Sequence, residues 1–143
     1  MKMTTFRKPF VIASVTLLGA IWASPALADP CEAPLPHQGE RFSGVVRYIG
    51  DGDGLCVGPA DRPDRWIEIR LADFYAPELH ERGGAEAKQR LAQLTLGKTI
   101  ACRAGRRSYD RVIAACTLGR RPLGQLLRDR GGVEGGRGWQ RRP

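Results

Sequence analysis

The chain lacks an uninterrupted apolar run of the length typical of a membrane-spanning helix. Its one extended apolar stretch, residues 10–22, falls short of the about 20 residues that a membrane-spanning helix needs, and Pro25 follows closely. Basic residues precede the stretch, and the small-x-small pattern of a cleavage site, Ala26-Leu27-Ala28, ends it. We therefore expect residues 1–28 to be a cleaved export signal; a retained membrane anchor is the alternative.

Histidine is scarce, and no Cys-x-x-Cys pair is present. The two histidines, His37 and His80, stand alone in the sequence. A zinc site is therefore the weaker interpretation of the four cysteines.

Two disulfides are the preferred interpretation, because an exported chain leaves the reducing cytosol for the periplasm or the medium. Three pairings are possible. We favour Cys102 with Cys116, because each lies in a strand-like run and a turn-rich segment separates them. That choice pairs Cys31 with Cys56.

Acidic residues are in the minority. Three of the 23 Lys and Arg and none of the 15 Asp and Glu precede residue 29, which leaves a net charge of about +5 on the remaining chain, of single-domain size. Such a surplus can serve solubility alone. Arginine, however, gathers in the last third of the chain, and its planar fork matches phosphate oxygens. A polyanion is therefore the predicted partner of a chain that we expect to be monomeric. The arginines concerned are Arg103, Arg106, Arg107, Arg111, Arg120, Arg121, Arg128, Arg130, Arg137, Arg141 and Arg142.

The hydrophobic pattern predicts three strands, a helix, two strands and a second helix. This order is expected of an α+β protein in which a five-stranded OB-type β-barrel carries helices. The predicted strands are Phe42–Ile49, Leu55–Val57, Trp66–Leu71, Thr99–Ala104 and Arg111–Leu118, and the predicted helices are Ala85–Leu96 and Leu123–Arg130.

Irregular segments flank the predicted domain, residues 42–132. Residues 29–41 contain three prolines and predict an extended arm. Residues 133–143 are rich in glycine and arginine and predict a flexible basic tail. We favour a disordered end over a dedicated nucleic-acid-binding tail.

Two carboxylates lie in the glycine-rich turn between the first two predicted strands. Asp51 and Asp53 alternate with Gly50, Gly52 and Gly54, so their oxygens can approach a hard cation. Asp-Gly is also a common hairpin turn. The turn indicates a metal site only if other functional groups converge on it.

Three further residues are candidates for such convergence. Arg70 ends the third predicted strand, Glu78 follows in the next loop, and Arg111 begins a later strand. A carboxylate that accepts a proton from water, with fixed positive charge near phosphorus, is what phosphodiester hydrolysis requires beyond a metal. Each residue taken singly is more often a surface ion-pair residue.

In order and spacing, four short motifs resemble the staphylococcal nuclease (thermonuclease) family. Together they extend over nearly all of the predicted domain, from about Phe42 to Gly132. The motifs are Asp51-Gly-Asp53-Gly-Leu, Arg70-Leu-Ala-Asp-Phe-Tyr-Ala-Pro77-Glu78, Gly97-Lys98 and Tyr109-Asp110-Arg111-Val-Ile-Ala.

The resemblance implies an OB-type barrel that carries a calcium-dependent nuclease acting on DNA and RNA. It implies that Asp53 is a metal ligand supported by Asp51, and that Glu78 is the general base or positions the attacking water. Arg70 and Arg111 are then the groups that clamp the phosphate. Tyr109 and Tyr75 are the residues expected to contact the substrate.

The sequence departs from the family pattern at two positions. Tyr75 stands where the family has a metal-ligating aspartate, and a neutral tyrosine is a poor ligand for calcium. Gly54 replaces a common threonine. If the third strand continued past Arg70, Asp73 would share the face of Tyr75 and partly restore the missing charge.

Three functions remain open. The leading hypothesis is an exported nuclease in which a divalent ion, calcium by resemblance, and two arginines hold the phosphate. The second is a catalytically impaired module that binds nucleic acid on the same surface. The third is an envelope protein whose charge serves only anionic surfaces.

Overall fold

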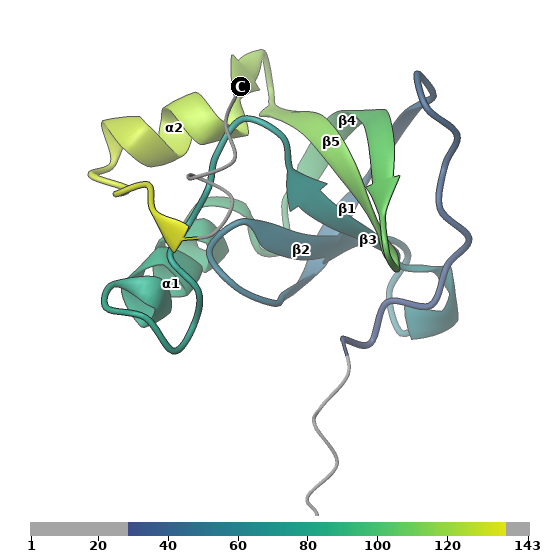
Figure 1. Ribbon diagram of the computed structural model, residues 1–143. Helices are drawn as coiled ribbons and strands as arrows, with labels where there is room; N and C mark the ends of the chain where they lie inside the picture. Colours follow the sequence, from purple (N-terminus) through teal and green to yellow (C-terminus); the bar gives the residue numbers. More distant parts are fainter. Residues whose placement is uncertain (1–28, 137–143) are drawn as a thin grey trace, which may run out of the picture.

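The protein combines one six-stranded sheet with two α-helices, as the computed structural model shows for residues 29–136 (Figure 1). The predicted export signal, residues 1–28, and residues 137–143 of the predicted tail lie outside the described residues. The predicted α+β class is confirmed.

The strands form a ring-like sheet. Neighbours in the order β3-β2-β1-β4-β5-β6 are antiparallel, and β3 also pairs in parallel with β5, with Ile69 opposite Val112. This parallel pairing places Arg70 opposite Ile113, and so brings together the two strands that carry the candidate arginines. The strands are β1 (Arg41–Ile49), β2 (Gly54–Val57), β3 (Ile67–Leu71), β4 (Thr99–Ser108), β5 (Arg111–Leu118) and β6 (Arg121–Pro122).

The predicted count of five strands is wrong, because β6 adds a sixth. Gly119 adopts a φ of 62°, which turns the chain so that Arg121 pairs with Leu118. A strand of two residues that includes Pro122 is too short to show an alternating pattern. Strand β4 also continues to Ser108, past an irregularity in register after Ala104, the predicted end.

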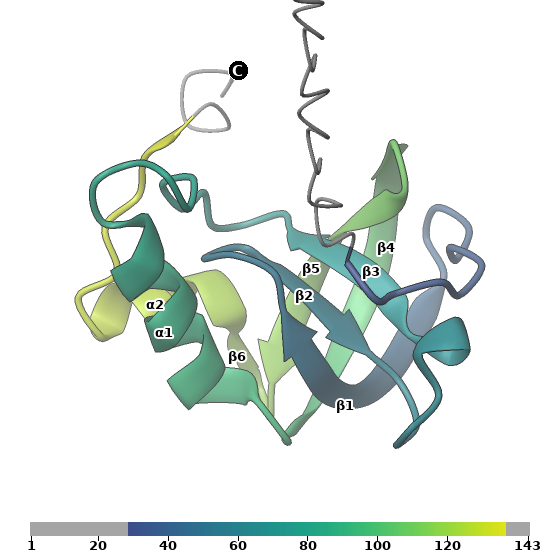
Figure 2. The same ribbon diagram turned by 90° about the horizontal axis from the view of Figure 1, so that it is seen from below.

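Two α-helices lie together at one end of the sheet, and the short 3-10 helix η1 (Pro63–Arg65) lies at the other (Figures 1 and 2). Helix α1 (Gly84–Thr95) buries one apolar face, as its spacing predicts. Helix α2 (Leu123–Asp129) buries Leu123, Leu126 and Leu127.

The core fills the interior of the ring and continues under the helices. Alternation along β3 places Ile69 and Leu71 inside, so Glu68 and Arg70 face outward. In β5, Val112 is likewise buried. Other large, fully buried side chains are Val46, Leu55, Val57, Phe74, Leu91, Ile100, Leu123 and Leu127.

The cysteines lie in two pairs at disulfide distance, and they are the predicted pairs. Cys102 and Cys116 are opposite each other in β4 and β5, with Cα atoms 4.1 Å apart. Cys31 and Cys56 tie the amino-terminal arm to β2, with Cα atoms 6.1 Å apart. Among residues 29–136 no cysteine is free, which fits an oxidising compartment.

Both flanking segments contact the domain. In the arm, Glu32 N donates to Pro63 O and Ala33 N donates to Trp66 O. At the other end, Gly135 N donates to Tyr75 O at 2.9 Å. The predicted flexible tail is therefore hydrogen-bonded to the domain as far as Gly135. Over the described range, no helix is long and apolar enough to cross a membrane.

Candidate functional site

The turn between β1 and β2 folds Asp51 back onto its own backbone. Asp53 N donates to Asp51 Oδ1 at 3.0 Å, and Gly50 N donates to Gly54 O at 2.9 Å. A Cβ atom at Gly54 would lie only 2.8 Å from Asp51 Oδ1. This contact gives a local reason for glycine at position 54.

Asp53 lies at the centre of the contacts among the candidate residues. Its side chain is 3% exposed, and Oδ2 accepts hydrogen bonds from Arg70 Nη2 at 3.2 Å and from Ala76 N at 3.1 Å. Burial, followed by repulsion from Asp51, raises the pKa of Asp53 to about 7, although Arg70 and the Ala76 amide favour the charged form. Burial and the neighbouring Asp51 therefore favour the neutral form of Asp53, against the effects of Arg70 and the Ala76 amide.

Arg70 and Arg111 lie on the two strands that close the ring. Both residues are half-buried, and both are on the outward-facing side of their strands. Arg111 Nε is buried and has no hydrogen-bond partner within the described residues. Two guanidinium groups on adjacent strands are suited to an anion with several oxygens, such as a phosphodiester.

Glu78 lies two residues after Ala76, which packs against the Asp51–Asp53 turn. A Cβ at Gly52 would lie 2.4 Å from Ala76 Cβ, so the turn packs directly against the segment that leads to Glu78. Glu78 N donates to Glu81 Oε2 at 3.0 Å, whereas the Glu78 carboxylate makes no hydrogen bond or ion pair with any described residue. The Glu78 side chain is half-buried.

Asp73 does not lie on an extension of β3, because that strand ends at Leu71. Asp73 Oδ2 instead accepts a hydrogen bond from Gly124 N at 3.0 Å, in the first turn of α2, and Asp73 O accepts one from Arg128. The condition for Asp73 to replace the missing metal ligand is therefore not met. Its carboxylate serves as a cap for α2.

The two tyrosines expected to contact substrate differ in exposure. Tyr109, in the turn between β4 and β5, is 98% exposed and has a φ of 58°. Tyr75 is half-buried, and its backbone N–H donates to Glu134 Oε1 at 3.3 Å. Only Tyr109 therefore offers a whole aromatic ring to a ligand.

Sequence reasoning missed Glu68, which lies on β3 two residues before Arg70. The residue is only 8% exposed, and burial, followed by the charges of Asp110 and Asp29, raises its pKa to about 7; Arg111 acts in the opposite direction. The alternation of Glu68 with Ile67 and Ile69 was the available signal, because it places Glu68 on the face of Arg70.

Metal-ligating groups are few in this region. Within residues 29–136, no group of three or more His, Cys, Asp or Glu side chains is placed to hold a metal ion. Asp51 and Asp53 nevertheless fit a hard cation chemically, because carboxylate oxygens are hard ligands. After burial, repulsion from Asp51 is the next cause that raises the pKa of Asp53, and a cation would reduce that repulsion. One or two carboxylates plus substrate phosphates is a usual arrangement for Mg²⁺, whereas Ca²⁺ takes six to eight oxygen ligands.

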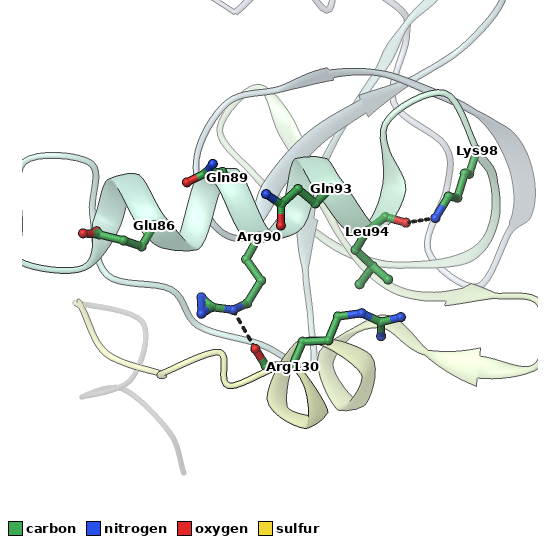
Figure 3. A pocket seen from close by; sticks show the side chains of 7 residues that line it. All are labelled: Glu86, Gln89, Arg90, Gln93, Leu94, Lys98 and Arg130. Atoms are coloured by element: carbon green, nitrogen blue, oxygen red, sulfur yellow. Dashed lines mark hydrogen bonds between the residues drawn. The ribbon is translucent and has the colours of Figure 1, made fainter.

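A cavity of about 380 Å³ lies between the two helices and contains none of the predicted site residues (Figure 3). Its cationic side chains bind backbone oxygens at helix ends: Lys98 Nζ donates to Leu94 O, Arg90 Nε to Arg130 O, and Arg130 Nη1 to Leu126 O. Each of these three cationic side chains therefore satisfies a backbone oxygen near the end of a helix.

Comparison with protein-family models and with curated proteins finds no match for this chain.

Proposed function

We propose that this chain is a thermonuclease-like domain of OB type that binds DNA or RNA and hydrolyses its phosphodiester bonds. The observation that carries the proposal is the placement of Arg70 and Arg111 on adjacent strands, with Arg70 bonded to the Asp51–Asp53 turn. The ring-like sheet with a helix after β3 supports the fold assignment. The disulfide pairs support export.

The two arginines bind the phosphate and offset the charge that grows on its oxygens during attack. Glu78 accepts a proton from water as the water oxygen forms its bond to phosphorus. The opposite P–O ester bond breaks, and its oxygen leaves as a hydroxyl after taking a proton from solvent. When bound by Asp51 and Asp53, a divalent cation supplies further positive charge that polarises the phosphoryl oxygens.

Cleavage of labelled single-stranded DNA and RNA by the oxidised protein tests this proposal. Each substrate is incubated with Ca²⁺, with Mg²⁺ or with chelator. Glu78→Gln should slow cleavage by roughly 10²- to 10⁴-fold while leaving binding intact. Arg111→Ala should weaken both. The matched controls are Glu86→Gln, an exposed acid on α1, and Arg120→Ala, an exposed arginine in the β5–β6 turn.

A binding module that does not cleave is the second candidate. Two observations favour it: Tyr75 supplies no carboxylate, and Asp73 is committed to α2. Salt-sensitive binding without cleavage under every metal condition, unchanged in Glu78→Gln, would establish this second function instead. Binding that is insensitive to salt and to Arg111→Ala would reject both.

A further inference from the structure

The nearly buried carboxyl group of Glu68 lies next to Arg111, one of the two arginines proposed to bind phosphate. Ile69 pairs with Val112 in the parallel β3–β5 pairing, and Glu68 and Arg111 are the residues one step earlier on the same two strands. Glu68 faces outward with Arg70, yet it is 8% exposed. Its neighbours must therefore cover it on the outer face of the sheet.

The guanidinium group of Arg111 is close enough to influence Glu68. The positive charge of Arg111 lowers the pKa of Glu68, against the larger effect of burial. Arg111 Nε is itself buried without a hydrogen-bond partner in the described part of the chain. Arg111 is thus not neutralised by a fixed ion pair, and an anionic ligand and Glu68 compete for the same positive charge.

The amino-terminal arm supplies the cover and a second carboxyl group. Cys56 is the register partner of Glu68 on β2, and its disulfide to Cys31 holds the arm over this face. Asp29 lies two residues before Cys31, and its Oδ1 is 3.3 Å from the position of a Cβ on Gly50. The charge of Asp29 raises the pKa of Glu68.

We propose that Glu68 and Asp29 form a carboxyl pair that sets the affinity of Arg111 for phosphate, with the disulfide-anchored arm holding the pair together. Glu68 is a positioning residue in this scheme, because it acts through Arg111 and not on the substrate. The proposal rests on the proposed function, since it requires that Arg111 bind a phosphate of nucleic acid.

The charged and titratable groups that face Glu68 come from several elements. Asp29 lies on the arm, Asp110 in the β4–β5 turn and Arg111 on β5, while Tyr48 on β1 has a pKa that is raised in part by Glu68. Because the pKa of Glu68 is about 7, its neutral form predominates below neutral pH and its anion above. Phosphate should therefore bind more weakly as the pH rises through 7.

The test measures the affinity of the oxidised protein for single-stranded oligo(dT) with chelator present, from pH 5.5 to 8.5. Glu68→Gln should bind at pH 8 about fivefold more tightly than the unmodified protein, as expected for the removal of one unit charge near the clamp. The pH dependence of its affinity should be correspondingly smaller. The exposed arm residue provides the matched control, Glu32→Gln, which should keep the original pH profile.

Asp29→Asn provides a second test that leaves Glu68 in place. Because Asp29 raises the pKa of Glu68, its neutralisation should move the binding transition to lower pH without removing it. This shift of midpoint is not expected if Glu68 only supports the fold. It also keeps the proposal testable if Glu68→Gln fails to fold.

The outcomes separate this inference from the proposed function. If Arg111→Ala weakens binding but both carboxyl variants keep the original pH profile, the inference is wrong and the function stands. If Arg111→Ala binds as the unmodified protein does, the proposed function fails and the inference fails with it. A smaller pH dependence in Glu68→Gln together with a shifted midpoint in Asp29→Asn supports both.

Discussion

At the scale of single residues, Asp53 is subject to two opposing effects. Burial disfavours its charged form, whereas hydrogen bonds from Arg70 and the Ala76 amide favour that form. Its pKa of about 7 lies above the value of about 4 expected in the unfolded chain. The folded state therefore binds more protons than the unfolded state between these values, and stability falls as the pH rises through 7. Above that pH the contribution is lost.

Asp53→Asn should therefore remove part of this pH dependence. With chelator present, we expect the melting temperature of the unmodified protein to fall from pH 5 to pH 8 and that of the variant to fall less, because asparagine carries no charge to bury. Asp61→Asn is the control, since Asp61 is exposed and asparagine tolerates its φ of 52°. Equal slopes for all three proteins in thermal unfolding would contradict the raised pKa.

Gly84 is a second residue whose replacement tests the site. A Cβ there would lie 2.0 Å from Glu78 O, so alanine must displace the loop that carries the candidate base. Gly84→Ala should cost about 1 to 3 kcal/mol of stability and lower the cleavage rate more than nucleic-acid affinity. Gln89→Ala, at an exposed position of α1, is the control for both measurements. Unchanged stability and cleavage in Gly84→Ala would show that the loop yields freely.

At the scale of elements, the arm is held by one covalent link and by backbone hydrogen bonds to the segment around η1. The Cys31–Cys56 pair encloses a separation of 25 residues. Replacement of both cysteines by serine should lower the free energy of unfolding by about 2 to 4 kcal/mol. Denaturant titration measures this change.

The same variant connects the arm to the site. Release of Asp29 from Glu68 should move the pH midpoint of binding in the same direction as Asp29→Asn. Peptide mapping under non-reducing conditions checks the pairing independently. Linkage of Cys31 to Cys102 would contradict the register described here.

At the scale of the whole molecule, the excess of basic residues over acidic ones favours a polyanionic partner. Binding that neutralises phosphates releases counterions, so the logarithm of affinity should fall linearly with the logarithm of salt concentration. Arg111→Ala should reduce this slope by about 1, as expected for the loss of one phosphate contact. Arg120→Ala should leave the slope nearly unchanged, and equal losses in the two variants would indicate a diffuse surface instead of a clamp.

Local patterns determined much of the fold because the physics behind them is local. The alternation of Glu68 and Arg70 with buried neighbours defined a strand face, and helical spacing in α1 defined its buried side. Chain order and turns also favoured the cysteine pairs that the structure shows, out of three possible pairings. Strand β6 gave no such signal, since two residues cannot show a period.

The sequence by itself predicted the helices and every strand except β6, favoured the cysteine pairs that the structure shows, and supplied the residue types of the candidate site. Only the tertiary structure decided which carboxylates lie next to the candidate arginines, because long-range contacts govern burial and partner choice. It committed Asp73 to α2, bonded Asp53 to Arg70 and set Glu68 beside Arg111. The parallel pairing of β3 with β5 and the anchoring of the arm join residues that lie far apart in the chain, and no local pattern records such contacts.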